Sequence, residues 1–124
     1  MIGQLLVVAV GGAFGAVARY GASLLGGLVF GRDTWVTTFA INVVGAFLLG
    51  ALAGLVTRRV EHWQLLNGLV AIGFLGAFTT FSTYALETVR LWQEGRVATG
   101  VAYAAGSVVA ALAAAWIGSR LTLA

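Results

Sequence analysis

Residues 34–57 read TWVTTFAINVVGAFLLGALAGLVT and contain no Asp, Glu, Lys or Arg. A helix needs about 20 apolar residues to cross the roughly 30 Å of hydrocarbon in a bilayer, so this stretch is long enough to span one. Residues 62–86 and 97–119 also lack these four residue types, and residues 2–25 are interrupted only by Arg19. The pattern predicts an all-α membrane protein with four transmembrane helices, at roughly 2–25, 35–57, 63–89 and 97–119.

The composition of the 124-residue chain excludes several other classes of protein. Hydrophobic residues make up 60% of it and charged residues 9%, whereas about a quarter of a soluble domain is charged. A soluble monomer and a disordered chain are both excluded. Without Cys, and with one His and four acidic residues, little is available for a metal centre or for acid–base catalysis. We therefore expect one transmembrane domain over residues 1–124, and no enzyme.

The arginines are divided equally between the two sides of the membrane. With four spans both termini lie on one side, which carries three arginines: Arg58, Arg59 and Arg120. The opposite side also carries three: Arg32, Arg90 and Arg96. An excess of positive charge normally fixes orientation, so either other factors resolve a weak bias or chains insert both ways and pair as an antiparallel dimer. Since the arginines form no basic stripe, we expect no nucleic-acid partner.

Glycines recur at helical spacing in two of the predicted spans. Gly11 and Gly15 lie four residues apart, as do Gly50 and Gly54. Such pairs of small residues let two helix backbones approach closely within a membrane. We interpret both pairs as packing sites.

Polar side chains inside the spans are costly and tend to mark function. Thr38 and Asn42 share a face of the second span, and Tyr103 and Ser107 share a face of the fourth. A lone hydroxyl can simply bond a carbonyl of its own helix. Asn42 is harder to explain in this way, because its amide has two donor hydrogens and an acceptor that need partners.

The third span contains a run that favours a break at midspan. The run is Thr79-Thr80-Phe81-Ser82-Thr83-Tyr84, and Gly73 and Gly76 precede it. Irregular backbone at membrane depth is tolerated only where protein or a water-filled cavity satisfies it. Carbonyls freed there would be hard oxygen ligands for a small cation.

Three segments of the sequence resemble the motifs of one family. The stretch 73–84, GFLGAFTTFSTY, resembles the third-helix signature of the Fluc (CrcB) fluoride channels. The stretches 11–20, GGAFGAVARY, and 37–45, TTFAINVVG, resemble the first-helix and second-helix motifs of that family. The resemblance extends over all four spans in the correct order.

The resemblance implies a passive, fluoride-selective channel in the bacterial inner membrane. Such a channel exports cytoplasmic fluoride and confers fluoride resistance. Each subunit has four spans, and two subunits form an antiparallel, dual-topology homodimer with two pores. The family also implies a structural sodium ion at the dimer interface, held by backbone carbonyls that correspond to Gly76 and Thr79 in this sequence.

The resemblance also implies which side chains line the fluoride path. Fluoride is strongly hydrated, so a pore must replace its water with donors. The amide and hydroxyl donors would be Thr38, Asn42, Ser82, Thr83, Tyr103 and Ser107. Phe81 and Tyr84 would offer ring edges, which carry the positive part of the ring quadrupole, and Arg19 would make the entrance electropositive.

Two positions depart from the family pattern. The family usually has Phe where this chain has Tyr84; a Tyr ring keeps its edge and adds a donor. The family often continues the row of hydroxyls one turn past Ser107, where this chain has Ala111.

Two other classes of membrane protein compete with a channel as interpretations of the sequence. A small proton-coupled multidrug exporter also uses four helices and antiparallel pairs, but it needs a carboxylate within a span, typically the first, which here has none. Glu87 is the one candidate, and it lies near the predicted end of the third span. A structural subunit of a larger complex would leave the polar run 79–84 unexplained.

The equal division of arginines leads to a prediction about topology. We expect a reporter fused to the C-terminus to be found on both sides of the membrane in comparable amounts. Two Lys residues added next to Arg59 should bias insertion toward one orientation. A wild-type fusion found on one side alone would exclude dual topology.

Overall fold

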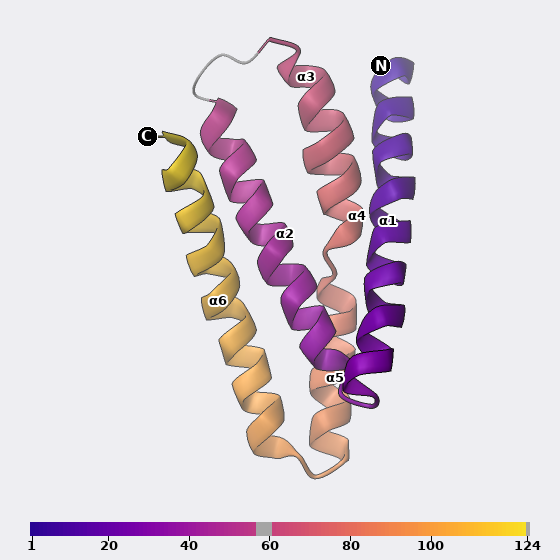
Figure 1. Cartoon of the computed structure of the whole chain (residues 1–124), viewed down its shortest axis with the longest axis vertical. Coiled ribbons are helices and arrows are strands. Elements are labelled where there is room, and N and C mark those ends of the chain that lie inside the picture. The colour runs from indigo at the N-terminus through magenta and orange to yellow at the C-terminus, as the bar shows by residue number, and fades with distance from the viewer. Residues whose placement is uncertain (57–60, 124) are drawn as a thin grey trace.

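The computed structural model describes residues 1–56 and 61–123, and most of that length is helical (Figure 1). Two long helices begin the chain: α1 (Ile2–Phe30) and α2 (Thr34–Val56). One long helix, α6 (Val97–Leu123), ends it. Four shorter elements follow one another between α2 and α6: α3 (Trp63–Leu66), the π-helix η1 (Asn67–Leu75), α4 (Gly76–Phe78) and α5 (Phe81–Gln93).

The described residues contain four segments long and apolar enough to cross a membrane: Ile2–Phe30, Thr34–Leu55, Trp63–Gln93 and Val97–Leu123. This confirms the predicted all-α, four-span class. Three of the spans run four or five residues past their predicted ends, to Phe30, Gln93 and Leu123. The prediction stopped the later two beside Arg90 and Arg120, but these arginines lie in the last turns of α5 and α6, where a cation interacts favourably with the helix dipole. The predicted end of the second span, residue 57, lies outside the described residues.

The start of α1 and the end of α6 lie at the same end of the bundle, as an even number of spans requires (Figure 1). The α1–α2 and α5–α6 connections lie at the opposite end. There, Arg96 donates a hydrogen bond from Nη1 to Asp33 Oδ1 at 2.6 Å, which joins the two connections directly. The Arg96 guanidinium, and then the Trp35 indole, hold the pKa of the Asp33 carboxyl below its ordinary value. The ion pair therefore persists at neutral pH and is lost only as the pH falls through that lowered pKa.

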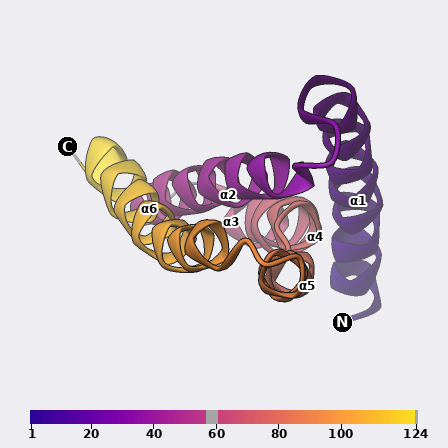
Figure 2. The same ribbon diagram turned by 90° about the horizontal axis from the view of Figure 1, so that it is seen from below.

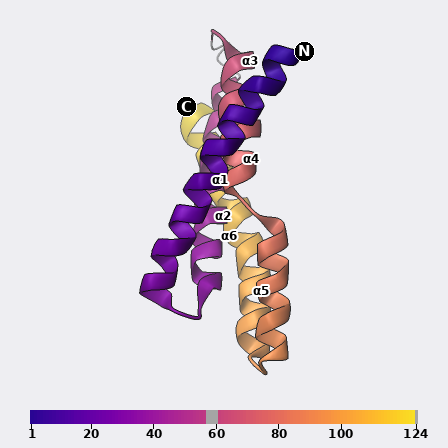
Figure 3. The ribbon, with the colours of Figure 1, turned by 90° about the vertical axis from the view of Figure 1, so that its right-hand side faces the viewer.

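The most extensive packing is between α2 and α6 and between α1 and η1. Seen from the end, α2 lies between α6 and α1, with the α3–α5 segment against it (Figure 2). From the side, α5 and the adjoining half of α6 run next to each other and diverge from the α1–α2 connection (Figure 3). The pairing places the junction of α4 and α5 in the middle of the bundle.

Small residues allow the close approach of these pairs. A methyl group at Gly11 or Gly15 would collide with the backbone of Leu69 or Phe74 in the third span. A methyl group at Gly50 would collide with the carbonyl of Ala115 in α6. The glycine pairs are therefore packing sites, as their spacing predicts.

The interior is unusually polar for so apolar a chain. Among the described residues, the buried hydrophobic side chains are Ile41, Leu52, Leu75, Leu91 and Tyr103, and as many polar ones are buried: Thr37, Thr38, Glu87, Thr88 and Ser107. Large apolar side chains are instead exposed along all four spans. This arrangement suits a molecule whose solvent is lipid, in which polar groups must find partners inside the protein.

The packing of α2 against α6 can be tested with two glycines on the same helix. Gly118→Ala places a methyl group against the carbonyl of Phe47, whereas Gly106→Ala meets no other atom within 4 Å. We expect Gly118→Ala to lower the free energy of unfolding by about 1–3 kcal/mol through overpacking. Gly106→Ala should leave it unchanged or raise it slightly, because Ala favours helix by up to about 1 kcal/mol. Equal melting temperatures for the two variants would contradict this packing.

Candidate functional site

Two residues with extended backbone separate α4 from α5 near the middle of the third span. Thr79 has φ −78° and ψ 156°, and Thr80 has φ −150° and ψ 118°. Thr80 caps the next helix, because its hydroxyl accepts a hydrogen bond from the Thr83 amide at 3.2 Å. The regular i to i−4 pattern is therefore interrupted here, and its backbone groups need other partners.

Asn42 on α2 supplies partners for both backbone groups of Thr80. Its Nδ2 donates to the Thr80 carbonyl at 2.9 Å, and its Oδ1 accepts from the Thr80 amide at 2.8 Å. In a continuous helix the Thr80 amide would bond the carbonyl of Gly76, which therefore loses its helical donor. An amide nitrogen carries two hydrogens, so Asn42 keeps one N–H for a further acceptor.

Arg19 on α1 bonds the last turn of α4. Its Nε donates to the carbonyl of Ala77 at 3.0 Å, and the side chain is half-buried. The Thr79 hydroxyl and amide both donate to the Leu75 carbonyl, at 3.0 and 3.1 Å. Side chains from α1 and α2 thus hold the two sides of the interruption.

A cavity of about 320 Å³ opens beside the interruption. It is lined from α2 by Asn42, Gly45, Ala46 and Leu49, from the third span by Leu75, Gly76, Thr79, Thr80, Phe81 and Tyr84, and from α6 by Ser107, Val108 and Ala111. Most of this lining is apolar. The Ser107 hydroxyl is buried and has no hydrogen-bond partner within the described part of the chain.

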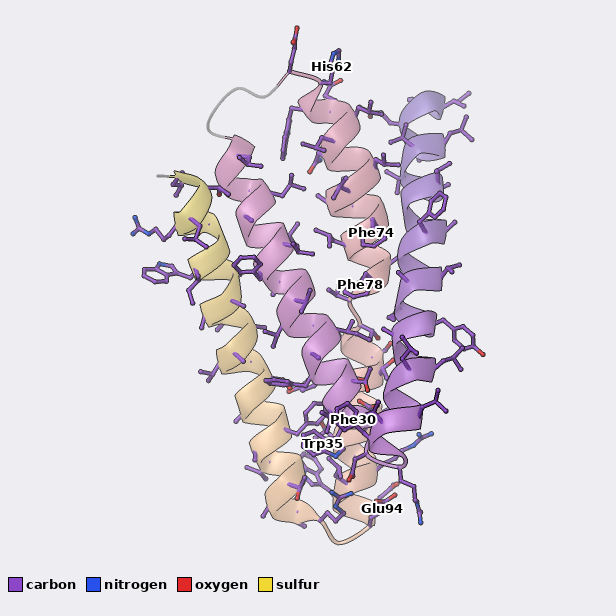
Figure 4. All side chains as sticks on the ribbon, viewed as in Figure 1. Phe30, Trp35, His62, Phe74, Phe78 and Glu94 are labelled. Atoms are coloured by element: carbon purple, nitrogen blue, oxygen red, sulfur yellow. The ribbon has the colours of Figure 1, made fainter. Side chains whose placement is uncertain are left out.

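Aromatic rings lead from this cavity toward the α1–α2 connection. The Phe81 and Tyr84 centroids lie 5.4 Å apart, and Tyr84 meets Tyr103 edge to face at 5.3 Å. Tyr103 in turn lies 5.5 Å from Trp35, which is at the start of α2, near Phe30 and Glu94 and far from His62 (Figure 4). Phe81 itself is 78% exposed, so most of its ring faces away from its own chain.

A second polar cluster centres on Glu87, which is 7% exposed. Its Oε1 accepts hydrogen bonds from the hydroxyls of Thr34 and Thr38, at 2.9 and 3.1 Å. Its Oε2 accepts one from the hydroxyl of Tyr103 at 2.9 Å. Three hydroxyl donors from α2 and α6 therefore surround one buried carboxyl group of α5.

Comparison with known proteins relates this site to one family. Residues 6–119 match the family model described as "CrcB-like protein, Camphor Resistance (CrcB)". The chain belongs to the CrcB family. A relative from Stutzerimonas stutzeri is 38% identical over 121 residues, 98% of each chain, and carries the name "Fluoride-specific ion channel FluC". Relatives with that name include one from Paracoccus denitrificans, 43% identical over 88% of this chain and 86% of its own. Another, "Fluoride-specific ion channel FluC 1" from Streptomyces coelicolor, is 43% identical over 90% of this chain and 71% of its own.

The structure brings together only some of the side chains predicted to line an ion path in this CrcB chain. Asn42, Phe81, Tyr84 and Ser107 line the cavity. Thr38 and Tyr103 bond Glu87, Ser82 is exposed near the cap of α5, and Thr83 accepts a hydrogen bond from the Thr80 hydroxyl at 3.0 Å. The donor that Tyr84 adds is already engaged, since its hydroxyl bonds the Ala104 carbonyl at 2.8 Å.

Sequence reasoning missed two features of the site. The sequence predicts that Asn42 faces an anion and gives no sign of its bonds to the Thr80 backbone. The predicted bounds place Glu87 near the end of a span, yet α5 continues six residues beyond it to Gln93. The hydroxyls of Thr38 and Tyr103 indicate that an acceptor such as Glu87 lies near them, because buried donors need an acceptor.

The two bonds of Asn42 can be tested by removing them. Asn42→Leu keeps the number of side-chain heavy atoms and the branch at Cγ but leaves the Thr80 amide and carbonyl unpaired, and we expect a loss of about 2–3 kcal/mol in the free energy of unfolding. Asn67→Leu is the matched control, because the Asn67 side chain makes no hydrogen bond within the described part of the chain. The measurement is thermal unfolding of the purified proteins. Equal stability of the two variants would show that Asn42 does not hold the interruption.

Proposed function

We propose that this chain forms a passive channel that is selective for fluoride, exports it from the cytoplasm and so confers fluoride resistance. The observation that carries the proposal is the similarity to proteins named fluoride-specific ion channels, at 38–43% identity over 88% or more of this chain. The cavity beside the interruption supports it, since its wall carries a few donors that have no acceptor within the described part of the chain.

The cavity chemistry suits a small anion. The Ser107 hydroxyl and the second N–H of Asn42 are donors, and no carboxylate is among the lining residues. The edge of the Phe81 ring adds a weakly positive contact that can replace water without offering a competing acceptor. Donors and ring edges of this kind would compensate fluoride for its lost hydration.

The active form is an antiparallel homodimer with two pores. The equal division of arginines favours insertion in both orientations. The polar groups around the interruption support pairing as well, because Ser82 is exposed and Thr79 and Thr80 are half-buried in a single chain. Polar groups cannot face hydrocarbon at this depth, so a second copy would cover them, and the exposed Phe81 would contact that copy.

The break in the third span would line the fluoride path and would also supply backbone carbonyls that bind a structural sodium ion. The donor set fits such an ion, because the Thr80 amide bonds Asn42 rather than Gly76 and so leaves the Gly76 carbonyl available. The carbonyls of Gly76 and Thr79 would hold the ion, and carbonyl oxygens are the hard ligands that small cations prefer. The positive charge of the ion would compensate carbonyl oxygens that have lost their helical donors.

A proton-coupled exporter is the second candidate, and Glu87 is the residue that would serve it. Both oxygens of Glu87 accept hydrogen bonds from hydroxyls, which suits a fixed structural acceptor. The similarity to fluoride channels also disfavours an exporter. The two functions differ in energy source, since an exporter needs a proton gradient and a channel does not.

Fluoride efflux from liposomes tests the proposed function. Purified protein should release fluoride rapidly when a potassium ionophore sets the membrane potential, with chloride far slower. Equal rates for the two anions, or a requirement for a proton gradient, would contradict a fluoride channel.

Two variants test which side chains line the path. Asn42→Asp puts a carboxylate where a donor is needed, and two like charges about 4 Å apart repel by about 4 kcal/mol at an effective dielectric constant of about 20. Fluoride transport should slow by about two to three orders of magnitude, less if the Asp is partly protonated. Phe81→Ile should also slow it, because the ring edge is lost.

The matched control is Phe30→Ile, which makes the same change at the last residue of α1, outside the cavity lining (Figure 4). We expect its fluoride rate to equal that of wild type. Size-exclusion chromatography checks that each variant remains assembled. If assembled Asn42→Asp and Phe81→Ile both conduct like wild type, these two side chains do not line the path.

A further inference from the structure

The first half of the third span is held by hydrogen bonds that reach one residue further than those of an α-helix. In η1 each amide bonds the carbonyl five residues back, and the Gly76 amide still does so to the carbonyl of Ala71. Helices of this kind are rare and usually extend over a single turn. Because more residues fit into each turn, the backbone of η1 is also wider than that of an α-helix. Contacts outside η1 must therefore favour it.

Two glycines of η1 that lie five residues apart both face α1. Gly68 and Gly73 are buried. Gly68 lies against the side chain of Val7, and Gly73 lies against the carbonyl of Val8 and the Cα of Gly11. On an α-helix each residue turns by about 100°, so residues five apart would point about 140° away from each other. The shared face therefore requires the longer turn of η1.

Contacts recur every four residues along α1 but every five along η1. A methyl carbon at Gly11 would lie 2.9 Å from the carbonyl carbon of Leu69 and 3.1 Å from the nitrogen of Phe74, which are the two ends of one bond of η1. A methyl carbon at Gly15 would lie 2.9 Å from the carbonyl carbon of Phe74. Two α-helices would meet at equal intervals. η1 therefore contains one residue more than an α-helix needs between these contacts.

The register of η1 determines where the residues after it lie. Gly76 begins α4 directly after η1 and lines the cavity. The next residue, Ala77, offers its carbonyl to Arg19. A shift of one residue would turn both by about 100° around the helix axis and move them by about 1.5 Å along it. Gly76 would then leave the cavity wall, and Arg19 would lose the carbonyl of Ala77.

From this register we propose that Gly11 is a positioning residue of the channel, which acts through η1 and does not touch the anion. It leaves room for the wide turn of η1, and so keeps within η1 the additional residue that aligns α4 with the cavity. A side chain at this position would press on the bond between Leu69 and Phe74 and expel the additional residue. The effect on the fluoride path rests on the proposed function, whereas the register of η1 does not.

Single-residue deletions test whether η1 contains an additional residue. Deletion of Ile72, which is 56% exposed, brings Gly68 and Gly73 four residues apart and lets an α-helix make the same contacts with α1. Deletion of Val109, which is 67% exposed on α6, is the control, because it turns the rest of an α-helix by about 100°. The protein without Ile72 should assemble and transport fluoride at nearly the wild-type rate. The protein without Val109 should lose about a hundredfold or more.

Substitutions on α1 test the positioning role. Gly11→Ala should slow fluoride efflux about tenfold, because the methyl group overpacks the wide turn. Gly12→Ala is the matched control and should equal wild type, because its methyl carbon would lie 3.9 Å from the carbonyl oxygen of Gly73 and meet nothing closer. Deletion of Ile72 from the Gly11→Ala variant should restore the rate, since a narrower α-helix leaves room for the methyl group. A general loss of packing would not be rescued by a deletion.

Solid-state NMR of labelled protein in bilayers measures the register directly. In the wild type the carbonyl carbon of Leu69 should lie about 4 Å from the amide nitrogen of Phe74, which is the separation across one hydrogen bond. Gly11→Ala should lengthen this separation. Deletion of Ile72 in the same variant should restore it, because the two groups are then partners in an α-helix.

Three results would overturn the proposal. The first is a wild type in which the Leu69 carbonyl bonds the amide of Gly73, as in an α-helix. The second is equal damage from the two deletions, and the third is equal fluoride rates for Gly11→Ala and Gly12→Ala. A wild type without fluoride-selective efflux overturns the proposed function instead. The NMR distances and the assembly of the deletion variants would then still decide whether η1 contains the additional residue.

Discussion

The pair of hydrogen bonds between Asn42 and the backbone of Thr80 is the contact on which the rest of this structure depends. An interrupted helix leaves amide and carbonyl groups without partners, and at membrane depth water is not there to supply them. Asn42 meets this need for both groups of Thr80 at once. Because Asn42 belongs to α2, its two hydrogen bonds to Thr80 also fix where α5 begins relative to α2. They therefore fix where Phe81 and Tyr84 lie beside the cavity.

A glycine and a buried polar residue outside the junction of α4 and α5 also help to hold the helices around it. Gly45 on α2 has no room for a methyl group because the Thr79 side chain lies against it, so the extended residues can lie close to α2. Further along α5, Glu87 ties that helix to α2 through Thr38 and to α6 through Tyr103. These contacts replace the apolar core of a soluble bundle, and in lipid they are the more specific way to fix helix positions.

Much of the fold could be predicted from the sequence, because span length and hydrophobicity follow directly from bilayer thickness. The close glycine contacts followed from helical spacing, and the Gly- and Thr-rich run 73–84 contains the extended residues Thr79 and Thr80. The partners of the polar side chains could not be predicted in the same way. Spacing says which residues of one helix share a face, but it does not say which element faces them, so the Thr80 partner of Asn42 and the Ala77 partner of Arg19 appear only in three dimensions.

The most direct test of this account is solid-state NMR of labelled protein in bilayers, observing Thr79, Thr80 and the Asn42 side chain. The account predicts Cα and Cβ shifts of extended backbone for Thr79 and Thr80, helical shifts for Phe78 and Ser82, and a Thr80 amide protected from exchange. Replacing Asn42 by Leu should remove that protection. Helical shifts at both Thr79 and Thr80, or a Thr80 amide that exchanges freely in the wild type, would contradict it.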